Sequence, residues 1–91
     1  MITRVGPNAY ASDEGFRVEV LGRTGLWYRE GDRELYIDSE ICQGGLIVYA
    51  DSIRAWAPPF DGESITPTEK EAIIANVRRA IESSGDSKLF V

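Results

Sequence analysis

The most regular pattern in the chain is a strict alternation of apolar and polar residues over Phe16–Val20. In an extended strand, successive side chains point to opposite sides. One side of this segment therefore has three apolar residues, and the other side has Arg17 and Glu19. We expect a strand that packs its apolar side against a core and leaves its charged side in water.

Two further strands are predicted at residues 26–30 and 33–38, on either side of Gly31-Asp32. A two-residue turn that begins with glycine is typical of a type II′ β-hairpin. The resulting cross-strand pairs are Glu30 with Arg33, Arg29 with Glu34, Tyr28 with Leu35, Trp27 with Tyr36 and Leu26 with Ile37. Both charged pairs have opposite signs and one pair is aromatic on both strands, each contributing ~0.2–1 kcal/mol. A shift of one residue would lose all these pairs together, so the pattern predicts this register.

The two sides of this hairpin differ in character. The apolar side, which we expect to face the core, consists of Leu26, Tyr28, Leu35 and Ile37. The other side combines aromatic and charged residues, namely Trp27, Arg29, Glu34, Tyr36 and Asp38. Such residues either cover the strands or form a contact surface, since Trp, Tyr and Arg are enriched at interfaces. With the neighbouring Glu40, we take these five as candidate partner-binding residues.

Weaker patterns complete the predicted fold. Short strands are expected at residues 2–5 and 46–50, and residues 9–11 are interpreted as a short extension. Residues 88–91 form either a last strand or a frayed tail. We expect a single α+β domain over residues 1–91. In this domain, a small antiparallel sheet of about five strands, connected as hairpins or a meander, has one C-terminal amphipathic helix packed on one face.

The helix start is marked by Thr66-Pro67-Thr68-Glu69. Threonine at the N-cap, proline at the first helical position and glutamate at the third form a capping box. The helix is expected over residues 67–83, with its apolar residues on one side.

A structural corner follows the strand at residues 46–50. Asp51 and Ser52 are expected to cap a helical turn that brings Trp56 back against the fold. Pro58 and Pro59 follow, and neither a helix nor a central strand accommodates a double proline. We interpret these five residues as a structural motif rather than as a catalytic one.

The chain has a net charge of −5, and its acidic residues are concentrated in the middle. Residues 30–71 contain ten acids and three bases, a balance of −7, whereas the remainder has five acids and seven bases. An acidic middle repels the phosphates of nucleic acid. It attracts and steers a basic protein partner instead.

Few residues are available for catalysis. The chain has no histidine, which excludes Ser-His and Cys-His nucleophiles and histidine-bound metals. Cys42 is the only cysteine and has no base of the usual kind beside it, so we expect it to have no role. Asp38, Glu40 and Asp51 either bind a divalent cation or cap turns and solubilise strand ends. We expect turn capping, with no metal, cofactor or catalytic residue.

Two segments resemble a known family: ELYIDSE at residues 34–40 and VYADSIRAWAPPFDGE at residues 48–63, followed by the helix that begins at Thr66. They are similar to the bacterial immunity protein 74 family. The resemblance covers residues 25–83, and its most specific part is the D-S-I-R-x-W-x-x-P run from Asp51 to Pro59. It implies a small cytoplasmic antidote that binds and neutralises a toxin delivered between competing bacteria.

Our leading hypothesis is therefore a non-enzymatic binding protein that occludes a cognate toxin, with a basic nuclease as one candidate class. A homo-oligomeric structural module and a carboxylate metal-binding protein are the alternatives. The chain lacks the apolar stretch of a signal peptide and any long apolar run, so we expect a cytoplasmic protein that does not enter a membrane.

Overall fold

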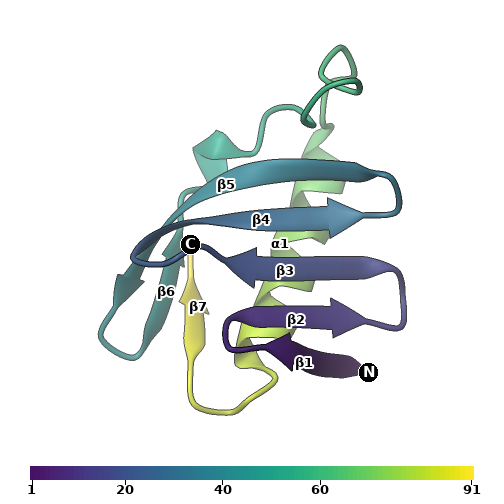
Figure 1. Ribbon diagram of the computed structural model, residues 1–91. Coiled ribbons are helices and arrows are strands. Elements are labelled where there is room, and N and C mark those ends of the chain that lie inside the picture. Colours follow the sequence, from purple (N-terminus) through teal and green to yellow (C-terminus); the bar gives the residue numbers. More distant parts are fainter.

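The computed structural model describes residues 1–91 and consists of one curled seven-stranded sheet with an α-helix behind it (Figure 1). The strands are β1 (Ile2–Gly6), β2 (Ala9–Ser12), β3 (Phe16–Val20), β4 (Thr24–Glu30), β5 (Arg33–Cys42), β6 (Gly45–Val48) and β7 (Lys88–Phe90). A 3₁₀ turn, η1 (Ala50–Ser52), follows β6, and the helix α1 (Pro67–Glu82) precedes β7. The predicted α+β class is confirmed.

The sheet is a meander in which spatial order follows chain order from β1 to β7. All neighbouring strands are antiparallel except β6 and β7, which are parallel because α1 connects them. There are seven strands rather than about five, because the short segments at residues 9–11 and 88–90 both pair with neighbours. Residues 88–91 are therefore not a frayed tail.

The predicted hairpin register is confirmed at all five pairs between β4 and β5. Gly31 has φ of 62°, while no residue other than glycine has a positive φ. That combination agrees with a type II′ turn, which needs the left-handed conformation only at its first central position.

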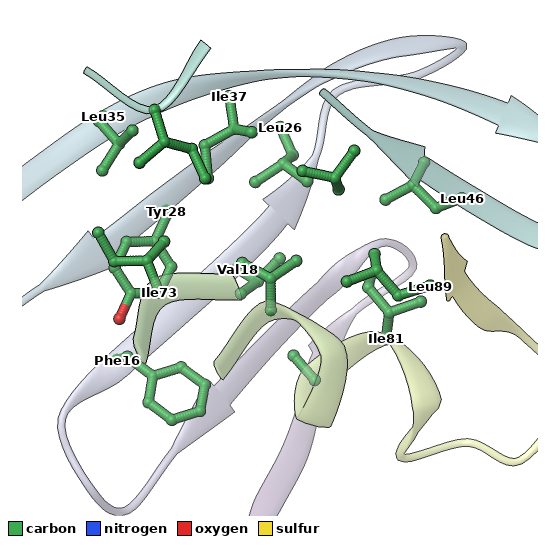
Figure 2. Packing of buried hydrophobic residues seen from close by; sticks show 14 of the residues in the cluster. Phe16, Val18, Leu26, Tyr28, Leu35, Ile37, Leu46, Ile73, Ile81 and Leu89 are labelled. Carbon is green, nitrogen blue, oxygen red and sulfur yellow. The ribbon is translucent and has the colours of Figure 1, made fainter. Parts of the chain in front are cut away.

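The core lies between α1 and the apolar side of the sheet (Figure 2). Fifteen residues form it, and the four core-facing hairpin residues predicted from the sequence are at most 2% exposed. Trp56 is also buried, and its ring stacks on Tyr28 with centroids 6.4 Å apart. Burial of this kind contributes about 1.5–3 kcal/mol for each large apolar side chain.

Helix α1 begins as predicted at Thr66. The side chain of Thr66 accepts a hydrogen bond from the backbone N–H of Glu69, and Glu69 accepts one from the N–H of Thr66. The buried residues of the helix are Ile73, Val77, Ala80 and Ile81, and they pack towards β2, β3 and β7. Because the helix covers this side only, the opposite side of the sheet stays uncovered (Figure 1).

Candidate binding surface

We call the side of β3, β4 and β5 that points away from α1 the outer face. Its exposed charged and aromatic residues are Arg17, Glu19, Trp27, Arg29, Glu34, Tyr36, Asp38 and Glu40. They share one side because they alternate with core residues along each strand and the strands pair in register. All six candidate partner-binding residues predicted from the sequence thus lie on one surface.

An aromatic pair occupies the middle of the outer face. Trp27 and Tyr36 are directly opposite each other on β4 and β5, with ring centroids 6.1 Å apart and planes at 79°. Trp27 is 36% exposed and Tyr36 is 44% exposed. Edge-to-face contact suits the quadrupoles of two aromatic rings. The pair therefore forms an ordered apolar patch that water still reaches.

Beside this pair is a hollow of about 300 Å³. It is lined by Arg17 and Glu19 from β3, Trp27 and Arg29 from β4, and Glu34 from β5. Arg17 and Arg29 are direct cross-strand partners, so two like charges face each other here. The lining of the hollow thus contains four charged residues, two of each sign.

The two opposite-charge pairs of the hairpin are in register, but neither forms an ion pair. Arg33 pairs with Glu63 instead of Glu30, and one of its guanidinium nitrogens lies 3.0 Å from each carboxylate oxygen of Glu63. Glu30 instead accepts a hydrogen bond of 2.6 Å from the Tyr28 hydroxyl. The pairing of β4 with β5 therefore rests on the backbone ladder and the apolar and aromatic pairs.

An acidic region lies at the other end of the outer face. The hydroxyl of Tyr49 donates a hydrogen bond of 2.9 Å to Glu40, and this bond raises the pKa of Tyr49. Asp38 and Asp51 line a separate shallow hollow together with Tyr49 and Arg54. Acids at this end add negative potential next to the aromatic pair.

Comparison with known families identifies the chain. The model of a family described as immunity protein 74 matches residues 12–89. The chain belongs to the immunity protein 74 family. The match extends further towards the N-terminus than the resemblance at residues 25–83, and it includes β3. No curated protein and no solved structure matches the chain.

Membership of an immunity protein family implies toxin neutralisation, and therefore a cognate toxin as partner. Proteins of this class typically act as binding inhibitors rather than as enzymes. No helix of this immunity protein is both long and apolar enough to cross a bilayer.

The alternative of a carboxylate metal site is not supported by the arrangement of the acids. Asp38 and Asp51 line one hollow, but Glu40 does not line it, and no group of three or more His, Cys, Asp or Glu in the structure could hold a metal ion. Glu40 lines another hollow together with Arg23 and Thr24, whereas Asp51 lies on η1 beyond the end of β6.

The residues of the structural motif hold the corner after β6. The Ser52 hydroxyl accepts a hydrogen bond from the N–H of Asp38 and donates one to the carbonyl of Tyr49. The expected cap is wrong in detail, because Asp51 and Ser52 lie within η1, whose N-cap is Tyr49 without a side-chain bond. The peptide bond between Pro58 and Pro59 is cis, and both prolines are exposed.

Two residues of the hollow, Arg17 and Glu19, were not among the candidate partner-binding residues. The alternation along β3 places them on the charged side of that strand. A meander puts β3 beside β4, but the sequence did not show the register that places Arg17 opposite Arg29 and Glu19 opposite Trp27. The turn at residues 21–23 contains no simple two-residue signal that would have established this pairing.

Proposed function

We propose that this immunity protein neutralises its cognate toxin by binding it through the outer face, and that it does so in the cytoplasm without enzymatic activity. The observation that supports this proposal best is the aromatic pair Trp27–Tyr36, exposed among charged residues on the side that α1 leaves uncovered. Interface residues that contribute most to affinity are enriched in Trp, Tyr and Arg.

Electrostatics favour a toxin with a basic surface. The balance of −7 over residues 30–71 includes Glu34, Asp38 and Glu40, all of which lie on the outer face. An acidic surface raises the rate at which a basic partner arrives, and salt reduces that rate. A toxin that acts on nucleic acid has such a basic surface, so a nuclease is the class that this charge pattern fits.

The direct test measures binding of the purified cognate toxin to a Trp27→Ala/Tyr36→Ala variant. Removing two central aromatic anchors should weaken binding by about 30-fold or more. A Thr68→Ala/Ala72→Ser variant on the exposed side of α1, which also leaves the charge unchanged, serves as the control and should bind as the parent does. Circular dichroism and light scattering of each variant exclude unfolding and self-association as causes.

The association rate should also fall steeply as salt is added, because the attraction acts at long range. Unchanged affinity of the Trp27→Ala/Tyr36→Ala variant would exclude the outer face as the binding surface. A salt-independent association rate would exclude a basic toxin surface while leaving the aromatic contact in place.

A further inference from the structure

Arg17 and Arg29 are the two residues of the outer face whose arrangement is unfavourable within the chain itself. They stand directly opposite each other on β3 and β4. Like charges at directly opposed positions of an antiparallel pair destabilise the sheet. A bound anion that contacts both arginines would offset this repulsion.

Neither arginine forms an ion pair within the chain, although Glu34 is the cross-strand partner of Arg29. The ion pairs of the chain are made by the Met1 amino group, Arg33, Arg78 and Arg79. The side chains of Arg17 and Arg29 also donate no hydrogen bond, in contrast to Arg4, Arg33, Arg54 and Arg79. Both guanidinium groups are therefore free to bind something outside the chain.

The surroundings of the two arginines leave space for a ligand. On β2 the residue opposite Arg17 is Ala11, which is small, and Trp27 forms one wall of the hollow. At about 300 Å³ the hollow has room for a side chain from another protein. A guanidinium group presents a planar fork of donors that matches a carboxylate through two parallel hydrogen bonds.

We propose that this hollow binds the carboxylate of an aspartate or glutamate side chain of the toxin, held between Arg17 and Arg29 and against Trp27. This inference rests on the proposed function, because it assumes that the toxin covers the outer face. In this proposal the acids and the arginines have different roles. The acids attract a basic toxin, and the arginine pair fixes the orientation of the bound toxin by recognising an acidic residue within its basic surface.

Glu19 and Glu34 narrow the choice of ligand. Both line the hollow, and the whole chain has a net charge of −5. A dianionic phosphate would meet two carboxylates and an overall repulsive field. A single carboxylate with basic neighbours suits the same hollow, because those neighbours pair with Glu19 and Glu34.

The first test needs no toxin. The side-chain N–H signals of Arg17 and Arg29 are followed by NMR while the blocked peptide Ac-Gly-Glu-Gly-NH₂ is added, with Ac-Gly-Gln-Gly-NH₂ as the uncharged match. Arg23, exposed and without an ion pair, is the internal control. We expect saturable shifts at Arg17 and Arg29 with the glutamate peptide alone. Equal shifts at Arg23, no shifts at all, or stronger binding of inorganic phosphate would overturn the proposal.

The second test compares Arg17→Gln/Arg29→Gln with Arg23→Gln/Lys88→Gln in toxin binding. Each double variant changes the net charge from −5 to −7, so both should associate with a basic toxin at least as fast as the parent. Only the Arg17→Gln/Arg29→Gln variant should dissociate faster, by about 10-fold or more. This variant removes the like-charge contact between Arg17 and Arg29 but also the opposite-charge pair of Arg29 with Glu34, so its stability should stay within about 1 kcal/mol of the parent.

The outcomes separate the two proposals. If Trp27→Ala/Tyr36→Ala leaves toxin binding intact, the outer face is not the binding surface and both proposals fail. If that variant weakens binding but Arg17→Gln/Arg29→Gln dissociates at the parental rate, the outer face remains and the carboxylate contact is overturned.

Discussion

The phenol ring of Tyr36 lies where a side chain at Gly25 would have to be. A methyl group on Gly25 would be 2.7 Å from Cζ of Tyr36, and Gly25 is buried beneath that ring. Gly25 also has φ of 85°, a conformation that glycine adopts at little cost. The glycine thus allows Tyr36 to lie flat across β4, where it meets Trp27.

Replacing Gly25 with alanine should therefore disturb the aromatic pair. Tyr36 can swing away because the conflict involves the far end of its side chain, so the stability cost should be mainly backbone strain of about 1–2 kcal/mol. Gly85→Ala is the matched control, with φ of 81° but open space around it. We expect similar losses in urea unfolding for both variants, and a changed near-ultraviolet circular dichroism spectrum for Gly25→Ala only. An unchanged spectrum would mean that Tyr36 does not depend on Gly25.

The buried hydroxyl of Ser39 makes no hydrogen bond, although the residue is only 3% exposed. Burying such a group costs about 1–3 kcal/mol. Ser39→Ala should therefore raise the free energy of unfolding by about 1 kcal/mol. Urea denaturation measures this directly.

Ser52 provides the comparison for Ser39, since its hydroxyl makes two hydrogen bonds that hold η1 against β5. Ser52→Ala should lower the free energy of unfolding by about 1–2 kcal/mol. If Ser39→Ala destabilised the protein as much as Ser52→Ala, the hydroxyl of Ser39 would have a partner in solution.

Tyr28 should make the fold sensitive to alkaline pH. Burial, followed by the hydrogen bond to Glu30, raises the pKa of Tyr28 above its ordinary value. The unfolded chain releases this proton near pH 10, whereas the folded chain keeps it. The folded state then binds more protons, so stability falls as pH rises above about 10, by up to about 1.4 kcal/mol per pH unit.

Tyr28→Phe isolates this contribution. The variant should be less stable than the parent at neutral pH, because Asn76 loses the hydroxyl to which it donates at 2.9 Å. Its stability should decline less than that of the parent between about pH 9 and pH 11. Parallel curves for the two proteins over this range would contradict the assignment.

The capping box at the start of α1 should contribute measurably to the stability of the fold. Thr66→Ala removes the side chain that accepts the hydrogen bond from Glu69 and should cost about 1 kcal/mol. Thr68→Ala lies in the same turn but removes no cap, and alanine favours a helix. Thermal unfolding should therefore distinguish the two variants. Equal effects would show that the cap is not needed.

Local features were predictable from the sequence because each depends on residues close together in the chain. The turn at Gly31-Asp32 and the alternating pattern beside it determined which residues of β4 and β5 face each other. Thr66 and Glu69 marked the start of α1 in the same way. Four of the eight outer-face residues belong to β5 and two to β4, so most of the candidate surface followed from one hairpin.

Only the tertiary structure decided which distant residues meet. The pairing of β3 with β4 places Arg17 opposite Arg29. The loop after Phe60 brings Glu63 to Arg33, which forms its ion pair there and not with Glu30. The parallel pairing of β7 with β6 depends on α1 returning the chain across the sheet. The last two of these contacts form when the chain closes long loops around a shared core, so no short segment of the sequence encodes them. The first joins neighbouring strands, but its register is set by packing, because the connecting turn has no recognisable type.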